Sequence, residues 1–245
     1  MPSPFSYSEY EQIIHHLQAT STILDYSKVN QDTNEFCVIR HDVEFSVERA
    51  HDLAIFEKHQ LNLTSSYLFQ LRNNCYNICS DINIGKMHDI LALGHSVGLH
   101  LHFGLLEDES QLIDYILQEV ELFQKLTGIK TDRFSYHRPT ASALKQYHQI
   151  EGLINCYSDI YFNYFESCPE NLPVKYYTDS RHIWQHGHPL TNTDKKIQLL
   201  THPYSWTQEG LNNFDNFSEL LQEKHRLMKQ SINNEISTFP VQLLR

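Results

Sequence analysis

One stretch, residues 38–44, constrains the fold more than any other part of the chain. It begins with apolar, β-branched residues and ends in charged ones (Val-Ile-Arg-His-Asp-Val-Glu), a pattern typical of a buried strand that delivers polar side chains to a pocket. Because side chains alternate across a strand, Arg40, Asp42 and Glu44 point to one side and His41 to the other. A core cannot hold this much charge unpaired, so the stretch indicates either a functional site or a structural ion pair between Arg40 and Asp42.

The rest of the chain alternates predicted strands with predicted helices. We expect strands at 36–42, 63–68, 95–102, 133–136, 153–157, 175–178 and 197–201. We expect helices at 7–18, 46–58, after 81 up to 93, 107–127, 141–149 and 217–228. The helix at 46–58 should turn Val47, Ala50, Leu53 and Ala54 inward, and the last helix Phe217, Leu220, Leu221, Leu227 and Met228. This alternation predicts an α/β fold with a parallel sheet, and a barrel is the natural closure for a single domain spanning residues 1–245.

Composition excludes several classes of protein. Hydrophobic residues make up 40% and charged residues 20% of the chain, as in ordinary globular proteins. The net charge of −11 argues against a nucleic-acid partner, because phosphate contacts need a basic face. No apolar run approaches the ~20 residues that span a bilayer, and the N-terminus lacks the features of a signal peptide. Five scattered cysteines argue against a disulfide framework, so we expect a cytoplasmic location.

Polar side chains gather where the predicted strands end. In a parallel barrel all strands open their carboxyl ends on one face, where such enzymes place their sites. We therefore expect distant segments to bring the following residues to one mouth: Asp42, Glu44, His100, His102, His137, Arg138, Asp179 and His202.

The spacing of His100 and His102 points to a metal. The two residues are two apart, so both imidazoles share one face of their strand. Two imidazoles and one carboxylate form a common open zinc site. We therefore predict a divalent ion, zinc by preference, bound by Glu44, His100 and His102. The alternative is a pair of hydrogen-bonded core histidines.

Two further residues suit acid–base chemistry. Asp42 lies beside the predicted metal carboxylate and can take a proton from attacking water, while His202 ends an apolar strand and can protonate a leaving amine. Arg138 can keep Asp42 ionised, bind a sugar oxygen or form a structural ion pair. Asp179 can orient Arg138 or His202, or be a turn residue.

Two tryptophans, Trp184 and Trp206, are expected in loops near these clusters. Sugar rings stack on exposed aromatic rings, so either side chain can contact a carbohydrate. The alternative for both is burial in the core.

The polar clusters at the strand ends, in their order along the chain, resemble the motifs of the polysaccharide deacetylase superfamily, carbohydrate esterase family 4. The resemblance covers roughly residues 35 to 206. Residues 40–44 look like the Arg-His-Asp-Val-Asp variant of its first motif, and residues 94–100 are similar to its Gly-His-Glu-Ile-Gly-x-His motif. Residues 137–139, 177–180 with Trp184, and 200–202 resemble the remaining three motifs. The resemblance implies a distorted (β/α)7 barrel, Asp42 as base, Glu44 and His100 as metal ligands and His202 as acid.

The sequence also departs from that pattern. Glu44 replaces the usual Asp, and Ser96 replaces the usual Glu. The second histidine ligand of the main family falls at Gly104, so His102 is the expected substitute. Arg40, His137 and Arg138 are then expected to contact substrate or support the ligands.

Taken together, these features predict a metal-dependent hydrolase that removes an acetyl group from an N-acetylated sugar. The resemblance implies a role in surface-polysaccharide assembly, with a substrate that can be nucleotide- or lipid-linked. The alternatives are hydrolysis of another non-peptide C–N bond, and a silent barrel that binds metal or carbohydrate. A glycosidase is less favoured, because it would use its carboxylates without a metal.

Overall fold

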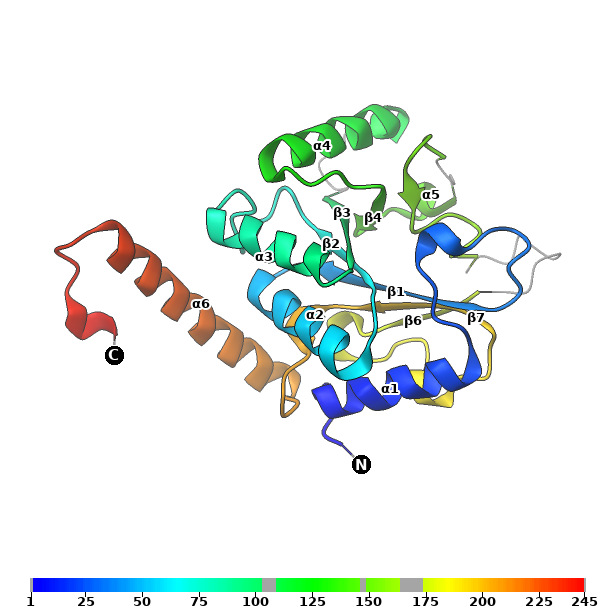
Figure 1. Ribbon diagram of the computed structural model, residues 1–245, viewed down its shortest axis with the longest axis horizontal. Coiled ribbons are helices and arrows are strands. Elements are labelled where there is room, and N and C mark those ends of the chain that lie inside the picture. The colour runs from blue at the N-terminus through cyan, green and yellow to red at the C-terminus, as the bar shows by residue number, and fades with distance from the viewer. Residues whose placement is uncertain (1, 103–108, 146–148, 164–173, 245) are drawn as a thin grey trace.

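Seven parallel strands form one curled sheet at the centre of the molecule (Figure 1). The computed structural model describes residues 2–102, 109–145, 149–163 and 174–244. The strand order is β5-β4-β3-β2-β1-β7-β6, and within the described residues no pairing joins β5 to β6. The predicted distorted (β/α)7 barrel is therefore confirmed as a curled half-barrel, whose edge strands β5 and β6 are not paired with each other in the described residues.

The strands lie close to their predicted ranges. Their bounds are β1 Phe36–Val43, β2 Ser66–Phe69, β3 Ser96–His102, β4 Arg133–His137, β5 Ile154–Asn155, β6 Lys175–Thr178 and β7 Lys196–Thr201. The chief difference is β5, which has two residues where five were expected. It pairs only with β4 and forms one edge of the sheet.

Four of the described helices begin at polar caps that the sequence supplies. The bounds of the helices are α1 Tyr7–Thr20, α2 Val47–Leu61, α3 Asp81–Ala92, α4 Leu112–Thr127, α5 Ala141–Lys145 and α6 Asn213–Glu235. The side chains of Ser6, Ser46, Ser80 and Asn212 each accept a hydrogen bond from the backbone N–H three residues later, satisfying a group that the helix itself leaves unpaired. The predicted helix start at 107 and part of the predicted helix 141–149 lie outside the described residues. No helix in the described part of the chain is long and apolar enough to cross a membrane.

The face of β1 that points away from the barrel interior has its own buried polar cluster. His41 contacts Thr201 Oγ1 at 2.7 Å through Nδ1 and Glu57 Oε1 at 3.0 Å through Nε2. The hydroxyls of Tyr10 and Tyr67 donate to the same Glu57 carboxylate. Burial alone would raise the pKa of Glu57, but His41, His95 and Ser65 together lower it to about 2. The cluster ties α1 and α2 to the sheet.

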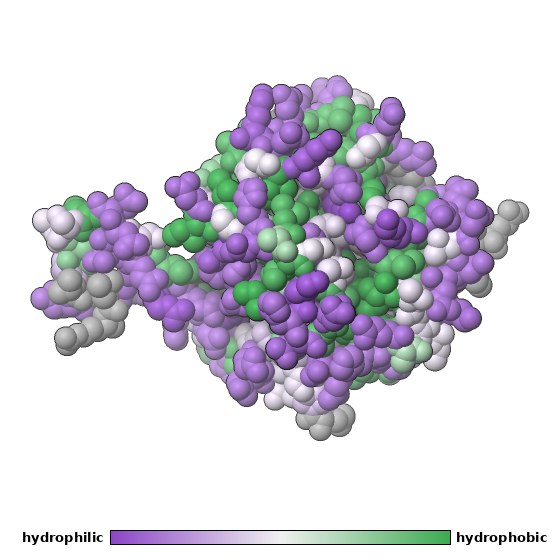
Figure 2. Space-filling model, viewed as in Figure 1, coloured by the Kyte–Doolittle hydropathy of each residue, from purple (hydrophilic) through white to green (hydrophobic). Residues whose placement is uncertain are grey.

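The last helix, α6, projects away from the body of the molecule (Figure 1). Leu220 is buried as predicted, but Leu221 and Met228 are 69% and 64% exposed, so their predicted inward orientation is wrong. Within the described residues, the buried side chains of α6 are Asn216 and Leu220, which both lie in its first turns. Hydrophobic side chains consequently reach solvent where the projecting segment leaves the body (Figure 2).

Gly98 allows the close approach of β3 to its neighbours. A Cβ atom at this position would lie 2.6 Å from Arg133 Cγ, Arg133 O and Leu68 Cδ2. Two of these atoms belong to side chains packed in the interior and one is backbone, so little can move aside.

Replacing Gly98 tests this packing. Gly98→Ala should lower the free energy of unfolding by about 1–3 kcal/mol or more, the usual cost of overpacking, measured by denaturant unfolding. Gly85→Ala is the matched control, because Gly85 is exposed on α3 and no atom lies within 4 Å of a Cβ built there. That control should stabilise the protein by roughly 0.5–1 kcal/mol through helix propensity. Equal effects of the two substitutions would contradict the close approach.

Candidate active site

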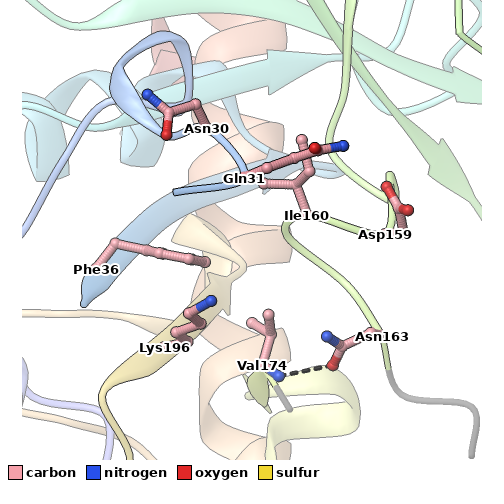
Figure 3. A pocket seen from close by; sticks show the side chains of 8 residues that line it. All are labelled: Asn30, Gln31, Phe36, Asp159, Ile160, Asn163, Val174 and Lys196. Carbon is pink, nitrogen blue, oxygen red and sulfur yellow. Dashed lines mark hydrogen bonds between the residues drawn. The ribbon is translucent and has the colours of Figure 1, made fainter. Parts of the chain in front are cut away.

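A cavity of about 660 Å³ opens at the carboxyl ends of the strands. Its walls combine charged groups with aromatic rings: Asp42, Glu44, Phe45, His100, Tyr136, His137, Arg138, Pro139, Tyr157, Tyr176, Ser180, Arg181, Leu200, His202, Tyr204, Asn213 and Phe217. A second hollow lies near Phe36 and Lys196, at the opposite ends of β1 and β7 (Figure 3). That hollow has only about 30 Å³, which is room for a water molecule or two. Of these two, only the first cavity is large enough for a small-molecule substrate, and the charged groups at the strand ends line it.

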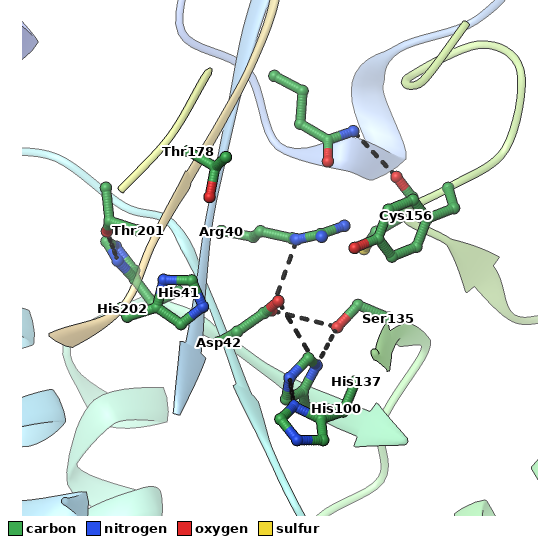
Figure 4. A network of polar contacts seen from close by, with 12 residues as sticks. Arg40, His41, Asp42, His100, Ser135, His137, Cys156, Thr178, Thr201 and His202 are labelled. Atoms are coloured by element: carbon green, nitrogen blue, oxygen red, sulfur yellow. Dashed lines mark hydrogen bonds and ion pairs between the residues drawn. The ribbon is translucent and has the colours of Figure 1, made fainter. Parts of the chain in front are cut away.

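Asp42 is the centre of a buried polar network in the barrel interior (Figure 4). Its Oδ1 lies 3.5 Å from Arg40 Nε and accepts a hydrogen bond of 3.1 Å from Ser135 Oγ, while its Oδ2 lies 3.5 Å from His100 Nδ1. The Arg40 guanidinium also lies over the Tyr157 ring, 4.3 Å from its centroid. Arg40 is fully buried, so the ion pair with Asp42 compensates its charge in the interior.

The same network fixes the tautomer of His100. Ser135 Oγ has one proton, which it donates to Asp42, so the 2.8 Å contact between His100 Nδ1 and Ser135 Oγ requires that Nδ1 donates. The lone pair of a neutral His100 then lies on Nε2, which faces Glu44 and His137. Burial lowers the pKa of His100 despite the nearby carboxylates, which favours this neutral form.

Glu44, His100 and His137 place one potential ligand atom each within 4.8 Å of one another. His137 Nδ1 lies 3.0 Å from Glu44 Oε1 and 3.1 Å from His100 Nε2, and His100 Nε2 lies 3.7 Å from Glu44 Oε1. Two atoms bound to one zinc ion at about 2.0–2.1 Å with a tetrahedral angle are separated by roughly 3.3–3.4 Å. The three distances bracket this value, so the group fits one divalent ion with an open position.

The charge of Glu44 also suits a ligand. Burial would raise its pKa, but the neighbouring side chains of His100, His137 and His202 hold the pKa of Glu44 well below its ordinary value. Glu44 is therefore ionised at neutral pH.

His202 is fixed on the other side of Glu44 by Asp179. The backbone N–H and Nδ1–H of His202 both donate to the Asp179 carboxylate, the latter at 2.6 Å, and Trp206 Nε1–H donates to it at 2.8 Å. His202 Nε2 then faces the cavity, 3.8 Å from Glu44 Oε1. Burial would lower the pKa of His202, but the Asp179 charge and hydrogen bond raise it from its ordinary 6.5 to about 9. Of the roles considered for Asp179, which were orienting Arg138, orienting His202 or forming a turn, the structure shows contact with His202.

Two residues predicted for the site, His102 and Arg138, are not part of the group formed by Glu44, His100 and His137. The ring of His102 lies 5.3 Å from that of His137 by centroids, but His102 is not among the three grouped residues. Arg138 is exposed at the cavity wall and, within the described residues, forms no ion pair, whereas Arg40 contacts Asp42. Gly104, where the main family has its second histidine, lies outside the described residues.

The two tryptophans lie in the core cluster rather than in the cavity wall. Trp206 is 1% exposed and packs edge-on against Tyr10, with ring centroids 5.1 Å apart. Trp184 is partly buried against the same cluster, 6.1 Å from Trp206. Of the alternatives considered, core packing describes both side chains in this structure, and Trp206 additionally supports Asp179.

Sequence reasoning missed Ser135 and did not consider His137 as a ligand. The two residues are two apart on β4, so they share one face of that strand, the same signal that singled out His100 and His102 on β3. Arg181 was also missed, because no strand or helix pattern marks it.

No protein-family model and no curated protein matches the chain. Similar solved structures include the chitin deacetylase from Colletotrichum lindemuthianum, with 15% identity and a TM-score of 0.42 over 83% of this chain and 86% of that chain. The family 4 carbohydrate esterase from Streptomyces lividans has 14% identity and a TM-score of 0.43, covering 78% and 90%. The Xyl-CE4 domain of a xylanase from the hindgut metagenome of Trinervitermes trinervoides has 11% identity and a TM-score of 0.43, covering 81% and 85%. Because these TM-scores are below 0.5, we base the function on the side chains themselves.

The contact between Asp179 and His202 predicts a pH dependence. A histidine whose pKa is raised by folding stabilises the protein fully below its ordinary 6.5, and this contribution is lost as the pH rises through about 9. A shift of this size corresponds to roughly 3 kcal/mol at about 1.4 kcal/mol per pKa unit. In metal-free protein, Asp179→Asn should lower the pKa of His202, as followed by NMR of the imidazole, and should remove the loss of stability between pH 7 and 10. An unchanged His202 pKa in Asp179→Asn would show that another group holds the proton.

Proposed function

We propose that the protein is a divalent-metal-dependent hydrolase that removes an acetyl group from an N-acetylated sugar. The observation that carries the proposal is the meeting, at one cavity, of three ligand groups and a histidine that holds its proton at neutral pH. Metal-assisted hydrolysis of an amide needs both parts, because the leaving amine must be protonated.

Glu44, His100 and His137 would hold the ion, with zinc as the best match to two imidazoles and one carboxylate. Asp42 and Ser135 orient the His100 ring from its other nitrogen, as residues behind a metal ligand commonly do. When bound, the ion supplies Lewis acidity toward an amide carbonyl and a more acidic water.

The chain's own residues carry the protons. Asp42 reaches the cavity wall, where its carboxylate can accept a proton from the attacking water. His202 donates a proton from Nε2 to the departing nitrogen, and Asp179 stabilises the imidazolium beforehand. Base and acid thus belong to different strands, β1 and the end of β7, on two sides of Glu44.

Two features support a sugar as the substrate: the sequence motifs and the residues of the cavity wall. Tyr136, Tyr157, Tyr176 and Tyr204 line the cavity with apolar ring faces and polar hydroxyls, a combination that suits a carbohydrate. The role in surface-polysaccharide assembly, in the cytoplasm, is proposed from the sequence resemblance and the cysteine usage. Hydrolysis of another non-peptide C–N bond would use the same three ligands, base and acid.

Metal content decides the ligand set. Purified protein should bind about one zinc per chain and release acetate from an N-acetylglucosamine oligomer, and a chelator should abolish the release. His137→Ala should lose most of the zinc, measured by elemental analysis, together with the activity. His102→Ala is the matched control and should keep the zinc. If His102→Ala instead loses the zinc and His137→Ala keeps it, the ligands are Glu44, His100 and His102, as the strand spacing predicts.

Asp42→Asn separates the two tasks of Asp42. If Asp42 takes the proton, the variant should lose about 10²–10⁴ in turnover, the usual scale of acid–base catalysis, with its zinc content unchanged. A loss of zinc affinity of about 10–100-fold would instead show that Asp42 acts mainly by orienting His100. Zinc titration alongside acetate release distinguishes the two results.

A further inference from the structure

Two arginines of the cavity wall have charges that nothing in the described protein neutralises. Arg138 and Arg181 both line the cavity and are exposed. Neither forms an ion pair within the described residues, in contrast to Arg40, Arg49, Arg72 and Arg133, each of which contacts an aspartate or glutamate. The chain as a whole has a net charge of −11, so these two cations stand out from its overall charge.

Both arginines also have backbone conformations that side chains normally avoid. Arg138 has φ of 52° and Arg181 of 63°, in the left-handed region that favours glycine. Arg138 directly precedes Pro139, which restricts its backbone further. Such conformations persist only where the surroundings impose them, and they are concentrated at functional sites.

The residues on both sides of Arg181 are held by buried contacts. Asp179 is fully buried and accepts hydrogen bonds from His202 and Trp206. On the other side His182 is buried, contacts the Leu211 carbonyl at 2.8 Å through Nε2 and stacks on Phe5. The turn between these two anchors therefore presents the Arg181 side chain at the cavity.

Arg138 is anchored in a similar way. It follows His137, whose ring is fixed by contacts with Glu44 and His100. The two arginines thus extend from the elements that position the ligand group and the acid, but neither contacts Asp42, Glu44 or Asp179 through an ion pair in the described structure.

From this arrangement we propose that Arg138 and Arg181 bind an anionic oxygen group, a phosphate or a carboxylate, on the sugar that is deacetylated. The inference rests on the proposed function and narrows its substrate to acidic or phosphorylated N-acetyl sugars. Guanidinium groups bind phosphate and carboxylate oxygens with paired, charge-assisted hydrogen bonds. At the cavity wall, the two arginines would hold the anionic group of the sugar while its acetamido group lies beside the three metal-ligand residues.

The test compares an anionic substrate with a neutral one. With zinc-loaded full-length protein, kcat/KM for acetate release should be at least about tenfold higher for N-acetylglucosamine 1-phosphate than for methyl N-acetylglucosaminide, in line with a charge-assisted contact. The ratio should fall as salt is added, because both arginines are exposed. An N-acetylated aminouronic acid distinguishes a carboxylate from a phosphate as the preferred group.

Glycine is the informative replacement, since it removes the guanidinium and accepts a positive φ without strain. Arg138→Gly and Arg181→Gly should each lower the ratio several-fold, and the double variant should bring it close to one, while the thermal midpoint does not fall. Arg181→Lys should keep part of the preference. Arg226→Ala, on exposed α6, is the matched control and should keep the wild-type ratio. Zinc content is measured for Arg138→Gly because His137 is adjacent.

The outcomes separate this inference from the proposed function. If the wild-type protein releases acetate with similar kcat/KM from neutral, phosphorylated and carboxylated substrates, the anion site is overturned and the proposed hydrolase is retained. If no substrate is hydrolysed, calorimetric binding of N-acetylglucosamine 1-phosphate that disappears in the double glycine variant would support the anion site without the hydrolase. Equal binding by the wild-type protein and that variant would overturn it.

Discussion

The alternation of side chains along β1 is the constraint on which the rest of the structure depends. Both faces of this fully buried strand carry ionisable groups: Arg40 and Asp42 on the inner face, His41 on the outer one. A shift of register by one residue would exchange the two sets. Each set must therefore find its own partners, and it does so on different elements. Ser135 and His100 meet Asp42 inside, while Glu57 of α2 meets His41 outside.

The inner partners in turn define the polarity of the cavity. Carboxylates, neutral imidazole and imidazolium coexist within a few ångströms because each has a different neighbour. His100 is kept neutral by burial, whereas His202, equally buried, is kept charged by a dedicated carboxylate. Two chemically identical side chains thus acquire opposite roles from the residues behind them, Ser135 in one case and Asp179 in the other.

The strand ends could be predicted from the sequence because periodicity and charge are local signals. The same reasoning predicted the buried stripe of α2, Val47, Ala50, Leu53 and Ala54, which the structure confirms. It failed for Leu221 and Met228 of α6, since an amphipathic pattern shows that a helix has an apolar face but not that a surface covers every residue on that face. The position of His137 beside Glu44 depends on how β3 and β4 lie against one another, and His102 and His137 are paired across those strands. Sequence spacing within one strand contains no information about that choice. The conformations of Arg138 and Arg181 likewise arise from anchors far away in the chain.

The contact between α1 and Trp206 has a consequence for where the folding unit begins. The sequence motifs span roughly residues 35 to 206, yet Tyr10 packs against Trp206, whose indole donates to Asp179, which in turn holds His202. A fragment cut to the motifs would expose that indole and loosen the support of the proton donor by a route that never touches the cavity. Borders drawn from motifs alone would thus divide a cooperative unit, and the amino-terminal helix belongs to the working part of the barrel.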